Sequence, residues 1–228
     1  GDWTSDGASN HSGSTDPSVH GGANFHLRVN GADITPAQVG TYLFTAPVPN
    51  YVAANKSVAP PRATPGDGLY GEYWQRGVNT IKTDGNTVAA NRIDTQIASF
   101  GAPSGTFAAT VLTYLGNDLS AVPGWLGADS ASFSGTPGNL DDGAFRFSGF
   151  INVAAPGKVN LGTTSDDGSR VKVGGVDIIN NDGGHGDATV DADVNFGAAG
   201  VYPIEITYFN GDWTSDGASN HSGSTDPS

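Results

Sequence analysis

The clearest pattern along the chain is an alternation of apolar and polar residues between positions 133 and 210. In "ATVDADVNF", for example, Val190, Ala192 and Val194 alternate with Asp191 and Asp193. Residues that alternate in this way point to opposite faces of a β-strand, and the apolar face lies on a core. The same period recurs around Phe145 to Val153, in "RVKVGGVDII" and in "VYPIEITYF", with Gly, Asp or Pro in the turns between them. Several short strands at this spacing predict an all-β protein, an antiparallel β-sandwich.

The N-terminal third of the chain adds two strands and a connector to this picture. Residues 68–75, "GLYGEYWQ", predict an aromatic strand, and residues 76–132 are less regular but are also expected to contain strands. Residues 21–30, "GGANFHLRVN", predict a strand whose apolar side chains share one face: Phe25, Leu27 and Val29. Between these strands, residues 35–67 hold many of the 13 prolines and are typical of an extended connector. The strand at 21–30 therefore faces a core but is separated from the other strands by a proline-rich linker.

Composition supports the β prediction and excludes some classes of site. The chain has 34 glycines and only 14 % charged residues, so it is poor in the Glu, Lys and Ala that build surface helices. Without cysteine it forms neither a disulfide nor a thiolate metal site. The chain has no run of about 18 consecutive apolar residues, so no membrane-spanning helix is predicted.

The net charge of −13 narrows the choice of partners. It repels nucleic acid and anionic membranes, and it favours hard divalent cations with oxygen ligands. A merely soluble acidic surface is the alternative interpretation of this charge.

The two ends of the chain are identical. "GDWTSDGASNHSGSTDPS" occupies residues 1–18 and recurs at residues 211–228, a period of 210 residues. The stretch lacks the basic and apolar regions of a targeting signal. The repetition instead indicates a periodic assembly.

The strand sequences resemble a known family. "GLYGEYW", "FSGFINVAAPGKVNLGTTSDDGSRVKVGGVDIINN" and "GAAGVYPIEITYFNG" are similar to a PA14 domain over about residues 68–211. The resemblance implies a jelly-roll-type antiparallel sandwich over residues 68–228, ending in the repeated loop. PA14 domains occur in surface adhesins, carbohydrate-active enzymes, toxins and yeast flocculins, which implies an extracellular or cell-surface location.

The resemblance also accounts for the isolated strand at 21–30. In the family, the Tyr-Pro strand is followed by a loop and one more strand, and here that strand follows the first copy of the loop. Residues 1–34 are therefore expected to complete a neighbouring copy, together with Tyr42, Leu43 and Phe44, and such contacts produce a head-to-tail filament. Two alternatives remain: the strand folds back through residues 35–67 into its own domain, or the chain is part of a covalent array of repeats.

The turn "TTSDDGSRV" is the strongest candidate for chemistry, since two adjacent carboxylates repel each other unless a cation or backbone donors compensate. In flocculin-type PA14 lectins the matching pair binds Ca²⁺ through a cis peptide, and an Asn after the Tyr-Pro strand completes the site. The resemblance thus implies a Ca²⁺ site at Asp166, Asp167, Asn210 and Asp212, with Trp213 beside a bound sugar. A plain Asp-Gly turn facing solvent is the alternative.

The remaining candidates are weaker. Trp3 and Trp213 suit an interface between subunits, while Asp141 and Asp142 suggest a turn or a second cation site. The histidines lack zinc spacing, so all five are expected in solvated loop positions: His11, His20, His26, His185 and His221. No catalytic motif is present, which predicts a protein that is not an enzyme.

Together these features predict an extracellular structural or adhesive protein, stabilised by Ca²⁺, that polymerises with copies of itself. The alternative function is a Ca²⁺-dependent carbohydrate-binding module in which Asp166, Asp167 and Trp213 face a glycan.

Overall fold

The computed structural model describes residues 23–44, 68–76, 81, 92–116 and 120–211. Several predictions lie outside these described residues: those for Trp3, His11, His20, Asp212, Trp213 and His221, both copies of the repeated loop, and the connector beyond residue 44.

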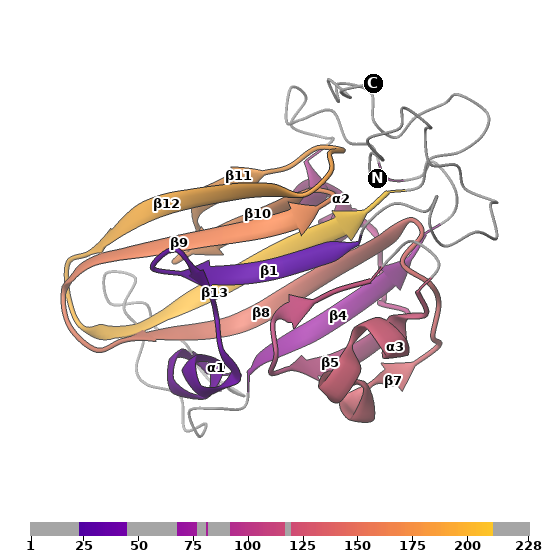
Figure 1. Cartoon of the computed structure of the whole chain (residues 1–228), viewed down its shortest axis with the longest axis horizontal. Coiled ribbons are helices and arrows are strands. Elements are labelled where there is room, and N and C mark those ends of the chain that lie inside the picture. Colours follow the sequence, from indigo (N-terminus) through magenta and orange to yellow (C-terminus); the bar gives the residue numbers. More distant parts are fainter. Residues whose placement is uncertain (1–22, 45–67, 77–80, 82–91, 117–119, 212–228) are drawn as a thin grey trace.

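Two antiparallel sheets pack against each other (Figure 1). The first sheet has the order β12 (Ala188–Phe196), β9 (Gly157–Asp166), β1 (Asn24–Val29) and β2 (Ala32–Asp33), and β6 (Thr113–Tyr114) also pairs with β1. The second has the order β11 (Val176–Asn181), β10 (Ser169–Val173), β13 (Gly200–Asn210), β8 (Gly143–Val153), β4 (Leu69–Gln75), β5 (Gly105–Ala109) and β7 (Ser134–Gly135), and β3 (Leu43–Phe44) pairs with β8. The predicted all-β antiparallel sandwich is confirmed.

An aromatic cluster fills the space between the sheets. Phe25 of β1 stacks on Phe147 of β8 with ring centroids 5.2 Å apart, and it lies 5.4 Å from the ring of Tyr208 on β13. Trp125 packs on both Tyr114 and Phe145, at 4.6 and 4.7 Å. Burial of several large rings gives a core of this size much of its hydrophobic stabilisation.

Strand β1 is built into the sandwich of its own chain. It lies between β9 and β6, with Phe25 opposite Ser165 on one side and Tyr114 on the other. Phe25 and Leu27 are 0 % and 1 % exposed, as the alternation predicts, and Val29 is partly buried against the same core. The placement is that of the back-folded alternative, while donation to a neighbouring copy stays a prediction.

The expected extended connector is wrong for residues 36–42, which form helix α1 (Pro36–Tyr42). Thr35 caps the helix by accepting from the Gln38 N–H, the Gln38 side chain reaches back to the Thr35 backbone, and Pro36 occupies the first turn. This capping box satisfies backbone donors that would otherwise lack partners. Val39 is buried, so the core also holds the helix in place.

Residues 92–132, where the sequence is less regular, contain short helices. They are α2 (Ile93–Ser99), α3 (Val122–Trp125) and a 3₁₀ helix (Gly127–Ser132). Helix α2 covers the outer face of the second sheet through a separate apolar cluster that includes Ile93, Ile97, Trp74 and Phe209. Within the part of the chain that the structure describes, no helix has the length and apolar character needed to cross a membrane.

Candidate cation site at the end of the sandwich

The predicted aspartate pair lies where strands of both sheets end. Asp166 is the last residue of β9, Asp167 follows it in the turn to β10, and Asn210 is the last residue of β13. Asn24, the first residue of β1, pairs with Asp166 across the first sheet. The fold therefore brings together three of the four predicted ligands, although Asp166 and Asn210 are 44 positions apart in sequence.

All three side chains are buried. Asp166 is 2 % exposed, and Asp167 and Asn210 are 0 % exposed. The alternative of a turn whose aspartates face solvent is therefore wrong. Burial of adjacent carboxylates costs free energy unless hydrogen-bond donors or a cation compensate.

Backbone donors hold Asp167 in a fixed orientation. Its Oδ1 accepts from the His185 N–H and its Oδ2 from the Gly211 N–H, both at 2.7 Å. The Tyr208 hydroxyl donates to the Asp166 carbonyl oxygen at 2.7 Å, and the Asp166–Asp167 peptide bond is cis, as the resemblance implies. Both oxygens of Asp167 therefore accept backbone donors, which fixes the direction of the carboxylate.

Asn210 is oriented by the neighbouring turn. Its Nδ2 donates to the Leu140 carbonyl oxygen at 3.1 Å, which leaves the amide oxygen on the opposite side of the group. The segment that supplies this acceptor continues into the predicted turn at Asp141 and Asp142. Asp142 is 1 % exposed and has a positive φ of 50°. The structure thus assigns this pair to a turn that supports Asn210.

Gly168 allows the turn to approach its neighbours closely. A Cβ atom at this position would lie 2.5 Å from Cε1 of Phe209 and 2.7 Å from the backbone nitrogen of Gly183. Both distances are far shorter than ordinary carbon contacts. Packing therefore requires glycine at the third position of the Asp-Asp-Gly turn.

The loop at residues 182–187 was not predicted to take part in the site. His185 donates its backbone N–H to Asp167, and both ring nitrogens face carbonyl oxygens, Gly186 O at 2.8 Å and Asn181 O at 3.0 Å. The expectation of a solvated histidine is therefore wrong for His185. It is also wrong for His26, which lies in β1 with its Nδ1 2.7 Å from Asp33.

Asp182 anchors this loop to helix α2. Its carboxylate, 1 % exposed, accepts from the backbone N–H groups of Ile93 at 3.1 Å and Gly183 at 3.0 Å. Burial raises the pKa of Asp182, although these two donors and the charge of Arg170 act in the opposite direction. Sequence spacing gave no signal for this role, because Ile93 is 89 positions away.

The donor set fits a hard cation. Carboxylate and amide oxygens are the ligands that Ca²⁺ takes, and its flexible coordination accepts backbone carbonyls as well. Among the described residues, no three His, Asp or Glu side chains gather as a metal-binding group. Of the predicted Ca²⁺ ligands, Asp166, Asp167 and Asn210 lie together here, and Asp212 lies outside the described residues.

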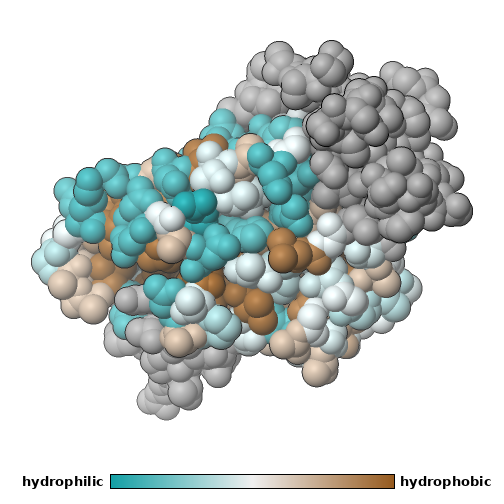
Figure 2. Space-filling model, viewed as in Figure 1, coloured by the Kyte–Doolittle hydropathy of each residue, from teal (hydrophilic) through white to brown (hydrophobic). Residues whose placement is uncertain are grey.

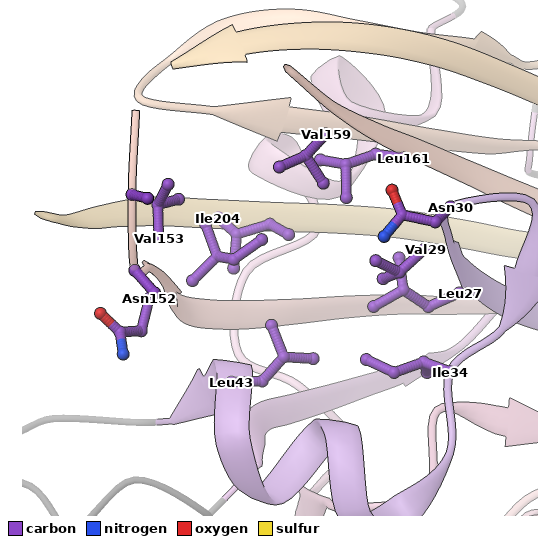
Figure 3. Close-up of a pocket in the computed structure, with 13 residues that line it drawn as sticks. Leu27, Val29, Asn30, Ile34, Leu43, Asn152, Val153, Val159, Leu161 and Ile204 are labelled. Atoms are coloured by element: carbon purple, nitrogen blue, oxygen red, sulfur yellow. The ribbon is translucent and has the colours of Figure 1, made fainter. Parts of the chain in front are cut away.

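A second feature is an apolar cavity of about 210 Å³ between the sheets, toward the other end of β9 (Figure 3). One wall comes from the N-terminal segment through Leu27, Val29, Ile34 and Leu43. The facing wall comes from β8, β9 and β13, and includes Val153, Val159, Leu161 and Ile204. The packing between residues 24–44 and the remaining sandwich is therefore tight at Phe25 and loose near Leu43.

Comparison with known proteins agrees with the fold. The family model of the PA14 domain matches residues 127–225. The PA14 sugar-binding domain from an RTX adhesin is 24 % identical, with a TM-score of 0.52, and the match covers 63 % of this chain and 82 % of that one. The PA14 domain of the antifreeze protein MpAFP is 21 % identical, with a TM-score of 0.49, and the match covers 67 % and 81 % of the two chains. No curated protein sequence matches the chain.

Proposed function

The chain contains a PA14 domain, and we propose that it is an extracellular structural or adhesive unit, stabilised by Ca²⁺, that assembles head to tail with copies of itself. The observation that carries the proposal is the position of β1. This strand completes the first sheet between β9 and β6, and it follows a loop sequence that recurs directly after β13. The loop after β13 thus has the same sequence as the loop before β1. In the proposed assembly, that loop leads into the strand that completes a neighbouring copy.

The covalent connection allows such an exchange. Residues 45–67 join β3 to the remaining sandwich, and a chain of this length can span up to roughly 75 Å when extended. A neighbour would accept residues 24–44 through the same contacts that the chain makes with itself. Exchange of an identical element is a low-cost route to assembly, and a heterologous exchange that does not close forms a fibre.

The assembly is tested by sedimentation and negative-stain electron microscopy over a range of concentrations. We expect linear fibres with a regular repeat, which disappear when residues 19–34 are deleted. A peptide of residues 19–34 should cap the deleted chain as a monomer and restore its stability. A full-length chain that remains a small particle at every concentration contradicts head-to-tail assembly.

Ca²⁺ binding is supported by the buried oxygen ligands at the ends of β9 and β13. Ca²⁺ that binds only the folded chain raises its stability by about 2.7 kcal/mol at one hundred times the dissociation constant. We expect EDTA to lower the melting temperature and Asp167→Asn to abolish the difference. Asp193→Asn, which changes an exposed carboxylate on β12, serves as the matched control and should retain the response to Ca²⁺.

Glycan binding is a second candidate function for the same site. The similar adhesin domain is a sugar-binding domain, and the segment after Asn210 carries Trp213, a side chain suited to stacking on a sugar ring. This function predicts binding on a glycan array that is lost with EDTA and with Asp167→Ala. Retention of no glycan in the presence of Ca²⁺ would exclude it and leave the structural role.

A further inference from the structure

Three residues form a row across the outer face of the first sheet. Arg28 on β1 and Asp191 on β12 both lie opposite Gly162 on β9, which separates the two strands. Nevertheless, Nε of Arg28 lies 3.5 Å from Oδ1 of Asp191. The charges of two strands that do not pair with each other therefore meet above the strand between them.

Gly162 makes this contact possible. A Cβ atom at position 162 would lie 1.9 Å from Oδ1 of Asp191, so any other residue would displace the carboxylate. Glycine inside a strand weakens the strand and marks a place where another group approaches closely. Here the approaching group is the side chain of Asp191.

The guanidinium of Arg28 is also held by the turn between β1 and β2 and by β9. Its Nη2 donates to the Gly31 carbonyl oxygen at 2.6 Å and its Nη1 to the Thr164 hydroxyl at 3.3 Å. The side chains of Arg28 and Asp191 are 20 % and 32 % exposed. Because the pair is partly removed from water, a reversed charge is screened less than at a fully exposed position.

The inward face of β1 does not fix the register by itself. A shift of β1 by two residues keeps apolar side chains on the core and moves Arg28 away from Gly162. The charge row therefore helps to distinguish the correct strand in the correct register from other apolar strands, in addition to the fit of Phe25 against Phe147 and Tyr208 and the hydrogen bonds from Asn24 to Asp187. Specificity of this kind comes from charge complementarity as well as from burial.

We propose that the groove between β9 and β6 selects the strand it accepts by charge, with Asp191 reaching across Gly162 to recognise Arg28 of a second copy of this chain. The inference rests on the proposed head-to-tail assembly and adds its rule of selection. Copies that carry the matching charges join, and apolar strands that lack the arginine are rejected.

The test uses a charge reversal divided between two chains. Arg28→Asp and Asp191→Arg each place like charges against each other when the chain pairs with itself. In a mixture, residue 28 of each variant has the charge opposite to that of residue 191 of the other variant. Exchange of β1 between the two variants therefore pairs opposite charges in both directions. The two variants are unfolded together, refolded and analysed by native mass spectrometry with isotope labelling of one variant. We expect mixed assemblies to exceed those of either variant alone by roughly tenfold, which corresponds to about 1.4 kcal/mol.

Two controls separate the pair from general effects on folding. The chain carrying both substitutions should recover the wild-type melting temperature, since the pair is restored with its charges exchanged. Gly162→Ala keeps both charges but displaces Asp191, so it should weaken assembly without any change in net charge. Circular dichroism establishes that each variant folds.

The outcomes distinguish this inference from the function on which it rests. Wild-type chains that assemble, together with variants that assemble with themselves as well as with each other, would overturn selection by charge and leave head-to-tail assembly intact. Wild-type chains that never exchange β1 would overturn both. Preferential mixed assembly supports both.

Discussion

Gly168 shows how a single residue couples packing to the candidate cation site. It follows Asp167, and its backbone lies against Phe209 and Gly183, with no space for a side chain. A methyl group there must push back either the aromatic ring of β13 or the loop that supplies the His185 N–H to Asp167.

Gly168→Ala is therefore expected to destabilise the domain by about 1–3 kcal/mol, the usual cost of overpacking. Ca²⁺ affinity should fall as well, because the Asp167 carboxylate loses its fixed position. Urea unfolding and calorimetric titration measure the two effects. Gly197→Ala is the matched control, since nothing lies within 4 Å of the added atom, and it should change neither quantity.

Asp94 makes stability depend on pH. Burial alone would raise its pKa, but hydrogen bonds and charge from Arg92 and Lys172 lower the pKa to about 2, from the usual 3.8. Because the folded pKa lies below the unfolded one, this carboxylate stabilises the fold above about pH 4. That stabilisation is lost as the pH falls through 2.

Asp94→Asn should therefore lower stability at pH 7 by about 1–2 kcal/mol, and the difference from wild type should shrink as the pH approaches 2. Urea unfolding at a series of pH values measures this convergence. Asp193 also has a lowered pKa through Lys158, but it is exposed and screened by solvent, so Asp193→Asn should have little effect at any pH. A constant difference between wild type and Asp94→Asn would contradict the assignment.

At the scale of elements, helix α1 is part of the segment that completes the sandwich. It connects β2 to β3, and its buried Val39 and the following Leu43 attach residues 24–44 to the core. The helix has seven residues, too few to be stable without its cap and its packing.

Removal of the cap by Thr35→Ala should cost about 1 kcal/mol. The loss should appear as faster amide hydrogen exchange in residues 37–43, before the rest of the sandwich exchanges. Thr35→Ser retains the hydroxyl and should behave as wild type. Equal exchange in the two variants would show that packing alone holds α1.

The elements differ in how far the sequence predicts them. A strand such as β12 has one face toward the core and one in solvent, so its period of two is visible in the residues themselves. Helix α1 has few apolar positions, and the many prolines of residues 35–67 suggested an extended chain, although Pro36 begins a helix. The aspartate pair and Asn210 were found through the resemblance, whereas Asp182 and His185 act through loop contacts that no local pattern encodes.

At the scale of the whole molecule, the N-terminal segment is packed tightly against the sandwich at one end and loosely at the other. Near the candidate cation site, the ring of Phe25 packs on Phe147 and Tyr208 of the second sheet, and the Trp125 Nε1–H donates to the Ala23 carbonyl oxygen at 2.8 Å. Toward the other end lies the cavity of about 210 Å³, which Leu43 helps to line. The surface in Figure 2 places hydrophilic residues over most of the visible first sheet, so polar side chains cover the face that carries the Arg28–Asp191 pair.

This difference in packing predicts that residues 24–44 begin to separate from the sandwich at the end that lines the cavity. Val159 lines the cavity from β9, and Val159→Ile adds one methylene to the empty space, which should stabilise the closed domain by about 0.8 kcal/mol. Because the cavity lies between the segment and the sandwich, the gain should appear as slower release of residues 24–44, and hence as slower assembly after dilution from a fully folded stock. Val176→Ile, at a position 46 % exposed, is the control and should leave the rate unchanged. If Val159→Ile raises the stability but not the lifetime of the closed form, then the segment must detach from the Phe25 end, and the cavity does not govern exchange between copies.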